Sequence, residues 1–154
     1  MSILKGLGHT FSRKPLIVGG RAMEWYGLRR SGDDVDVVIS EADFTCISLT
    51  LGRGLEWKTD PKEGKRSRPC LLNVNGDRGL MIEAYDVWAA IRGFGYDFLR
   101  QGARDGGDYL VVSIDKLMFM KSLSMFNREK DFRDVQLIVA AVNEPRLFNN
   151  IRGG

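Results

Sequence analysis

The chain has 154 residues, of which 44% are hydrophobic and 28% charged, with a net charge of +3. This length and composition are typical of a single soluble domain with its own core, and the mildly basic balance permits an anionic partner without requiring one. No apolar run reaches the roughly 18 residues of a membrane span, and the first residues lack the apolar region and cleavage site of a signal peptide. We therefore expect a cytoplasmic protein with no membrane partner.

The cysteines and the histidine argue against a zinc centre. Cys46 and Cys70 each lie within an apolar stretch and form no CxxC pair, so we expect both to be buried free thiols. The one histidine, His9, has no Cys or His cluster around it in the sequence. A zinc site is therefore not expected.

The N-terminal third alternates short apolar segments with glycine turns. Residues 2–13 fit a short, weakly amphipathic helix, and residues 16–18 fit a buried strand. Residues 21–28 lie between two glycine turns and are expected to be helical. Residues 35–39 form a second apolar strand, and residues 41–51 suit a helix.

The middle of the chain is rich in turn residues. Residues 58–69 are polar and basic, which predicts an exposed loop or hairpin tip. Asn75-Gly76 separates the apolar runs 70–74 and 79–85. Asn-Gly between two apolar runs is a strong hairpin signal, so these runs are expected to pair with each other.

The C-terminal part is predicted to be helical after a short strand at 109–112. Ser113 is a candidate N-cap, and Asp131 and Asp134 resemble a capping pair for the last helix. Strands, a hairpin and then helices predict an α+β fold with a mixed sheet flanked by helices and a helical C-terminal segment. We expect one domain over residues 1–143 and a flexible tail over residues 144–154.

A glycine pair and two acids carry the clearest chemical signal. Gly19 and Gly20 follow the first strand, and Asp34 and Asp36 open the second. Alternation along a strand puts the two acids on one face, and two carboxylates beside a glycine turn at a helix N-terminus can hold a divalent metal ion against a phosphate chain. The alternatives are a purely structural turn and solvated acids. Because exposed acids are less expected at the start of an apolar strand, the pattern favours phosphoryl or nucleotidyl transfer.

Glu83 is the candidate third metal ligand. It lies in the apolar segment 80–84, where a carboxylate is costly unless it is paired, hydrogen-bonded or bound to a metal. Asp86 is the alternative residue for this role. A structural ion pair between Glu83 and an arginine is the competing explanation.

These residues resemble the pattern of the nucleotidyltransferase superfamily, which has a polymerase-beta-like fold. In that pattern a strand ends in Gly-Gly or Gly-Ser, and a helix, an Asp-x-Asp strand and a third acid follow. Residues 19–38 look most like the small bacterial members related to the toxins of type IV abortive-infection systems. Further along, residues 114–121 and 128–135 resemble that group's helical segment K-L…R-x-K-D-x-x-D-L. Glu83 departs from the pattern, whose third acid is usually Asp.

The resemblance implies a role for each matching residue. Asp34, Asp36 and Glu83 would be catalytic and would bind one or two Mg²⁺ ions. The nucleotide, an NTP, would be bound by Gly19, Gly20, Arg30, Ser31, Lys116, Arg128, Lys130 and Asp131. An NMP would pass to a hydroxyl of an RNA, a protein or a small molecule, and a cognate antitoxin or an assembly subunit would be a candidate partner.

Two other interpretations remain open beside that enzyme. One is a catalytically silent domain of this fold that serves as a binding or assembly subunit, and the other is an unrelated α+β domain with an accidental Asp-x-Asp. The basic segment 58–69 also has two interpretations, since its cations fit either a solvated hairpin tip or a backbone-directed contact with RNA. These cations are Lys58, Lys62, Lys65, Arg66 and Arg68.

Overall fold

The computed structural model describes residues 9–32, 35–50, 55–59, 66–71, 80–83 and 95–144. Its centre is a mixed sheet with the strand order β5-β2-β1-β7-β6, and β3 and β4 form a separate antiparallel pair. β1 is antiparallel to β2 and parallel to β7, whereas β2 is parallel to β5. The strand bounds are β1 Leu16–Ile17, β2 Val35–Val38, β3 Leu55–Thr59, β4 Arg66–Leu71, β5 Leu80–Glu83, β6 Arg104–Asp105 and β7 Leu110–Val111.

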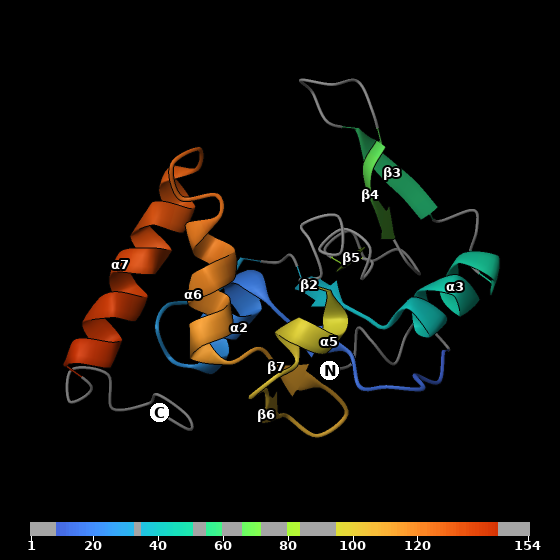
Figure 1. Ribbon diagram of the computed structural model, residues 1–154, viewed down its shortest axis with the longest axis horizontal. Coiled ribbons are helices and arrows are strands. Elements are labelled where there is room, and N and C mark those ends of the chain that lie inside the picture. The colour runs from blue at the N-terminus through green and yellow to red at the C-terminus, as the bar shows by residue number, and fades with distance from the viewer. Residues whose placement is uncertain are drawn as a thin grey trace.

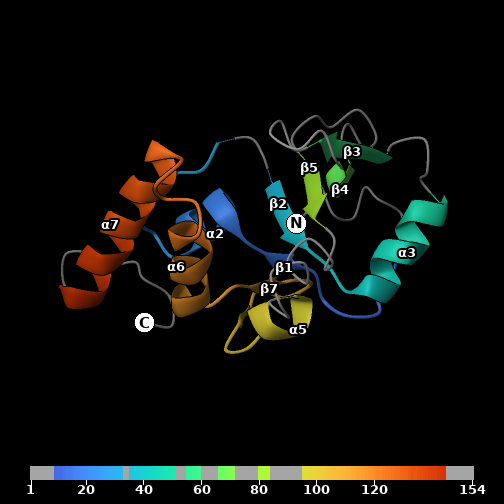
Figure 2. The same ribbon diagram turned by 45° about the horizontal axis from the view of Figure 1, so that its top comes forward.

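The helices lie on both sides of this sheet (Figures 1 and 2). α6 and α7 pack against each other and lie with α2 to one side, whereas α3 lies at the opposite end of the molecule (Figure 1). The described residues thus have an α+β fold with a mixed sheet and a helical C-terminal segment, as the sequence predicts. The helix bounds are α2 Gly19–Trp25, α3 Glu41–Thr50, α5 Tyr96–Leu99, α6 Ile114–Ser122 and α7 Glu129–Asn143. Within these ranges, no helix combines the length and the apolar character needed to cross a bilayer.

Strand β1 is buried throughout, and so is every residue of β2 except Asp36. Leu16 and Ile17 of β1 are 0% and 1% exposed, and Val37 and Val38 of β2 are both 0% exposed. Adjacent residues of one strand point to opposite faces, so both faces of the sheet are covered here. This explains why the strands are short continuous apolar runs, and it makes a polar residue such as Asp36 within β2 conspicuous.

Gly27 follows the end of α2, which runs from Gly19 to Trp25 rather than over the predicted residues 21–28. Gly27 has a φ of 77°, a left-handed conformation that glycine adopts without steric cost. Its N–H donates to the carbonyl of Glu24, and the N–H of Leu28 donates to the carbonyl of Met23. This pair of bonds is a Schellman motif, which turns the chain from α2 towards β2.

The segment before β1 is not helical over residues 9–13, and the rest of the helix predicted at 2–13 lies outside the described residues. The N–H groups of Ser12 and Arg13 donate to the carboxylate of Asp43 in α3, so they are not available for helical bonds. His9 and Ser40 also hydrogen-bond this buried carboxylate. Burial alone raises the pKa of Asp43, but these four hydrogen bonds outweigh burial and hold the pKa below its usual value.

The middle segment differs from one prediction and covers part of another. Strand β3 runs to Thr59 and β4 begins at Arg66. Both ends of the predicted loop 58–69 therefore belong to strands. Of the hairpin predicted between 70–74 and 79–85, only residues 70–71 and 80–83 are described. There β4 and β5 lie close together, while β4 pairs with β3 and β5 pairs with β2. Asn75-Gly76 and the rest of this hairpin lie outside the described residues.

Two predictions about single residues have opposite outcomes. Ser113 is the N-cap of α6 and accepts a hydrogen bond from the N–H of Lys116, as predicted. Cys46 is a free thiol but is exposed rather than buried. The helical period explains the error, since Cys46 lies on the outer side of α3 while Asp43 and Ile47 turn inward.

Candidate functional site

The glycine turn and Asp36 are immediate neighbours. Gly19 has a φ of 62°, and a Cβ added to it would lie 2.9 Å from Asp36 Oδ2. The backbone is joined here too, since the N–H of Val18 donates to the carbonyl of Asp36. Asp36 is half-buried in a strand whose other residues are apolar. The structure therefore brings the first glycine of the pair against one of the two acids.

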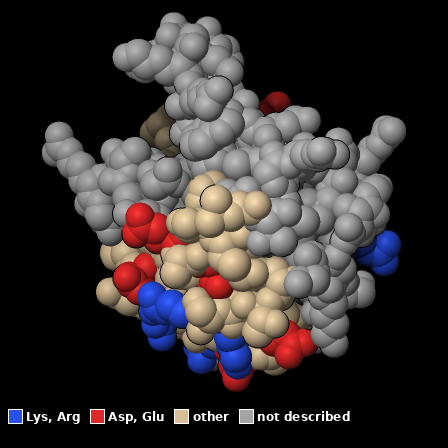
Figure 3. Space-filling view, turned by 90° about the vertical axis from the view of Figure 1, so that its right-hand side faces the viewer, with Lys and Arg blue, Asp and Glu red and all other residues tan. Residues whose placement is uncertain are grey.

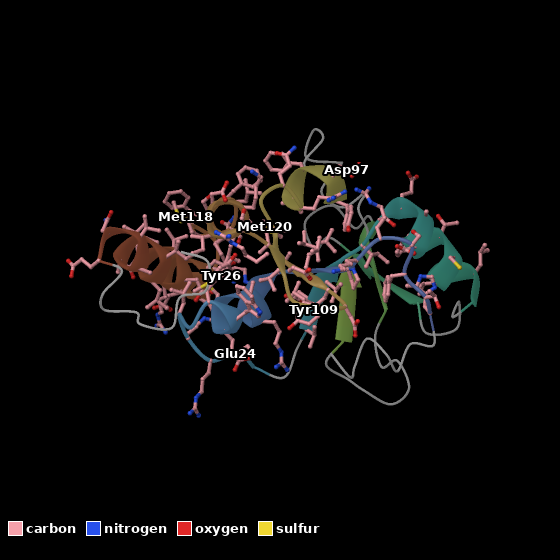
Figure 4. All side chains as sticks on the ribbon, turned by 90° about the horizontal axis from the view of Figure 1, so that it is seen from below. Glu24, Tyr26, Asp97, Tyr109, Met118 and Met120 are labelled. Atoms are coloured by element: carbon pink, nitrogen blue, oxygen red, sulfur yellow. The ribbon has the colours of Figure 1, made fainter. Side chains whose placement is uncertain are left out.

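Gly20 lies beside a different part of the predicted site. Its Cβ position would be 3.5 Å from the Cβ of Ser31 and 3.6 Å from Nη1 of Arg29. Ser31 Oγ donates to Glu24 at 2.8 Å, and Glu24 lies on the outer side of α2, away from α6 and α7 (Figure 4). Arg30 is exposed, and its carbonyl accepts a hydrogen bond from Arg29. Four predicted residues, Gly19, Gly20, Ser31 and Asp36, thus lie around one turn.

A buried charge cluster, consisting of Arg29, Lys121, Asp131 and Asp134, lies next to this turn. Arg29 donates through Nε and Nη2 to the two oxygens of Asp134, at 2.6 and 2.8 Å. Lys121 Nζ lies 2.9 Å from Asp134 and 3.1 Å from Asp131. The cluster connects the segment after α2 to both C-terminal helices.

The electrostatics of the cluster keep its acids ionised. Burial raises the pKa of Asp134, but the hydrogen bonds from Arg29 and Lys121 outweigh burial and lower it overall. The same holds for Asp131, whose carboxylate accepts from Ser124 and Lys121. The hydrogen bond to Asp134 in turn raises the pKa of Arg29. The cluster contains two cations and two anions, so it adds no net charge to the site.

These contacts overturn the capping role predicted for Asp131 and Asp134. Helix α7 begins at Glu129, and its N-cap residue, Arg128, makes no capping hydrogen bond through its side chain. The two aspartates point into the protein, where they are 2% and 1% exposed. They bind cations instead of the first amides of the helix. Asp131 is therefore held within the protein by Lys121 and Ser124.

Lys116 and the start of α7 also have partners of their own. Lys116 Nζ lies over the ring of Phe98 at 4.6 Å and contacts Asp115 at 3.4 Å. Arg128 contacts Asp131 at 3.6 Å, and Lys130 is exposed on α7. The contacts of Lys116 thus lie on the α5 side of α6, and those of Arg128 lie at the junction between α6 and α7.

Of the other predicted metal ligands, only Glu83 lies within the described residues. Asp34 and the alternative Asp86 lie outside the described residues. For Glu83 the structure gives the backbone position: it pairs with Val38, two residues along β2 from Asp36. Within the described ranges, no group of three or more Asp, Glu, His or Cys side chains could hold a metal ion.

The predicted basic segment is divided between two strands. Lys58 lies in β3 opposite Arg68 of β4, and Arg66 begins β4. Lys62 and Lys65 lie outside the described residues. On the described part of the face shown in Figure 3, acidic and basic side chains are interspersed. That part of the surface thus gives a mixed field rather than a field of one sign.

Arg29 and Lys121 are not among the predicted site residues, although the sequence contains a signal for a buried cation. Lys121 shares the inner side of α6 with Leu117 and Met120. A lysine on the apolar side of a helix needs a buried anion as its partner. Asp131 and Asp134 similarly repeat at the spacing of the buried face of α7, on which Ile138 lies.

Comparison with known proteins gives no family assignment. No family model matches the chain, and no curated protein matches it significantly. The candidate site accordingly rests on the contacts among Gly19, Gly20, Ser31 and Asp36.

Proposed function

We propose that the protein is a metal-dependent nucleotidyltransferase that moves an NMP from an NTP to an acceptor hydroxyl. The observation that carries the proposal is the contact between the Gly19 turn and Asp36, in which a Cβ would come within 2.9 Å of the carboxylate. A glycine pair allows a phosphate chain to approach the backbone closely, and the adjacent carboxylate would face that chain through a cation. Resemblance to the nucleotidyltransferase pattern supports the same chemistry.

The chemistry of Asp36 fits a magnesium ligand. Mg²⁺ is bound in proteins through one or two carboxylates together with substrate phosphates. Asp36 supplies one carboxylate, and the parallel register that puts Glu83 opposite Val38 supports Glu83 as a second. Asp34 is proposed as the third. Bound Mg²⁺ would neutralise the triphosphate and lower the pKa of the acceptor hydroxyl.

The other proposed roles concern binding. Gly19 and Gly20 would lie along the β and γ phosphates, and Ser31 would hydrogen-bond the nucleotide from beside Gly20. Attack of the acceptor oxygen on the α phosphorus would release pyrophosphate. Most of the rate enhancement would come from positioning and charge neutralisation, as in phosphoryl transfer generally. The acceptor is proposed to be an RNA, a protein or a small molecule.

One observation favours a second function. Lys116, to which the resemblance gives a phosphate-binding role, has its ammonium over the Phe98 ring and beside Asp115. A site without this cation would bind an NTP more weakly and neutralise less of its charge. The second candidate is therefore a catalytically silent domain of this fold that acts as a binding or assembly subunit.

The deciding experiment compares binding with turnover. Wild-type protein is titrated with each of the four NTPs, with and without Mg²⁺, and pyrophosphate release is then measured in the presence of total RNA and of lysate protein. The proposal predicts Mg²⁺-dependent binding of at least one NTP and release of pyrophosphate. Binding without release would favour the silent domain, and neither binding nor release would refute both.

Two variants locate the activity. Asp36→Asn keeps the shape of the side chain but removes the charge, and it should abolish both Mg²⁺-dependent binding and pyrophosphate release. Asp97→Asn is the matched control, because the Asp97 side chain is 82% exposed on α5 and its contact is with Arg13 rather than with the glycine pair. Equal activity of the two variants would contradict the assignment of Asp36.

A further inference from the structure

The ion pair between Arg29 and Asp134 joins the candidate site to the last helix, α7. Arg29 holds both oxygens of Asp134 through two hydrogen bonds, although 105 residues separate the two in the chain. The side chain of Asp134 is 2% exposed and that of Arg29 is 20% exposed. A two-pronged bond of this kind fixes the plane of the guanidinium as well as its distance. Lys121 holds the same carboxylate from α6 at 2.9 Å.

The fixed guanidinium lies directly beside the glycine pair. Nη1 and Nη2 of Arg29 would be 3.6 and 3.7 Å from a Cβ at Gly20, which is ordinary van der Waals distance. Nη1 also donates to the carbonyl of Arg30, the residue that precedes Ser31. Arg29 thus lies beside Gly20 on one side and orients the Ser31 segment on the other.

Stability alone does not account for this arrangement. Taking two cations and two carboxylates out of water is costly, and well-packed apolar residues often stabilise a protein as well as a buried ion cluster does. What apolar residues cannot do is hold a planar group in one orientation through directed bonds. The position of that group beside Gly20 and its bond to the Arg30 carbonyl give the orientation a consequence for the site.

We propose that Asp134, held by Lys121, is a positioning residue for the candidate nucleotide site. It fixes Arg29, and Arg29 in turn fixes the relative placement of Gly20 and Ser31. This inference rests on the proposed function for the identity of the substrate, but the placement itself can be measured without any substrate. In this arrangement α7 supports the nucleotide site from behind rather than contacting the nucleotide.

The test uses the full chain and four variants. Asp134→Asn removes the charge and presents an N–H group to Arg29. Arg29→Lys keeps a cation but cannot make the two parallel hydrogen bonds of the guanidinium. The matched controls are Glu129→Gln and Arg133→Ala, which break an ion pair of 2.7 Å on the exposed side of α7. All measurements are made at a temperature at which every variant is fully folded by circular dichroism.

Two readouts are taken. The first is amide hydrogen exchange in residues 19–32, compared with residues 41–50 in α3, which contains no residue of the charge cluster. Asp134→Asn and Arg29→Lys should accelerate exchange in residues 19–32 about tenfold and leave α3 unchanged, whereas the controls should change neither region. The second is steady-state kinetics with the NTP. In these two variants KM should rise, and kcat/KM should fall on the order of 10²-fold, the loss expected when bound groups shift by about 1 Å.

The outcomes separate this inference from the proposed function. Unchanged exchange in residues 19–32, or an equal increase in α3, would overturn the positioning role, because a merely structural pair loosens the whole protein. A lower thermal midpoint with an unchanged KM would also overturn it. If wild-type protein neither binds nor turns over an NTP, the proposed function fails, and the exchange comparison still decides whether Asp134 positions the turn.

Discussion

Replacing Gly19 by alanine tests the contact on which the candidate site depends. The new methyl group would lie 2.9 Å from Asp36 Oδ2 and 3.6 Å from the Cβ and Cγ atoms of Asp36. The nearest atom is the end of a flexible side chain, so the carboxylate can rotate away while the backbone stays in place. We therefore expect a folded protein in which the Asp36 carboxylate is displaced.

The cost to stability can be estimated from the backbone. Gly19 has a φ of 62°, and a left-handed conformation costs an L-residue about 1–2 kcal/mol. For a protein of this size, each kcal/mol lowers the thermal midpoint by about 2–4 °C, so Gly19→Ala should lower it by about 2–8 °C. Gly102→Ala is the matched control, because Gly102 has a φ of 70° and its Cβ would meet Ser113 at an ordinary 3.6 Å.

The assay compares the two variants in thermal unfolding and in Mg²⁺-dependent NTP binding. Both should lose similar stability, but Gly19→Ala alone should lose NTP binding, since it alone displaces Asp36. Equal NTP binding by the two variants would refute the reasoning that links this turn to the site. A much larger stability loss in Gly19→Ala would show that Asp36 cannot rotate away.

Three further predictions concern stability. Gly20→Ala should be as stable as wild type or more so in urea unfolding, because its Cβ would meet Ser31 at 3.5 Å and alanine favours a helix by about 0.5–1 kcal/mol; a clear loss would contradict the described turn. Tyr26 donates to the buried carbonyl of Val112 at 2.8 Å, and burial is the main cause that raises its pKa to about 12. Tyr26→Phe should therefore cost about 1 kcal/mol in urea, and no cost would mean that the bond is not made in solution. The pKa of Asp43 is lowered in the folded state, so the stability it contributes is complete above its unfolded pKa of about 3.9 and is lost as pH falls through the folded pKa. The thermal midpoint of wild type should fall below about pH 4 more steeply than that of Asp43→Asn; parallel profiles would contradict the role of this carboxylate.

Features that depend on neighbouring residues were predictable from the sequence. The buried strand at Leu16–Ile17 follows from an apolar run between turns, and the cap of α6 follows from Ser113 ahead of a helical pattern. The proximity of Gly19 to Asp36 follows from one strand, one helix and one antiparallel strand in succession. Each of these signals is contained in a short stretch of chain.

Features that depend on distant contacts were not predictable. Asp43 binds backbone amides 30 and 31 residues earlier, and no periodicity marks that partnership. The pairing of Arg29 with Asp134 joins residues 105 positions apart, so Asp134 appeared to be a cap because only its local setting was visible. The parallel pairing of β5 with β2 likewise joins distant segments, and no signal in the sequence around β5 marks that partner.

Nucleotide transfer by this chain, the proposed function, can be followed through labelled product. Wild type and Asp36→Asn are incubated with each α-³²P-labelled NTP, Mg²⁺, total RNA and lysate protein, and the products are separated by size and by nuclease and protease sensitivity. A metal-dependent nucleotidyltransferase should put label on one acceptor class with wild type, none with Asp36→Asn, and none when Mg²⁺ is chelated. Absence of label on any acceptor with wild type, or equal labelling by both proteins, would contradict it.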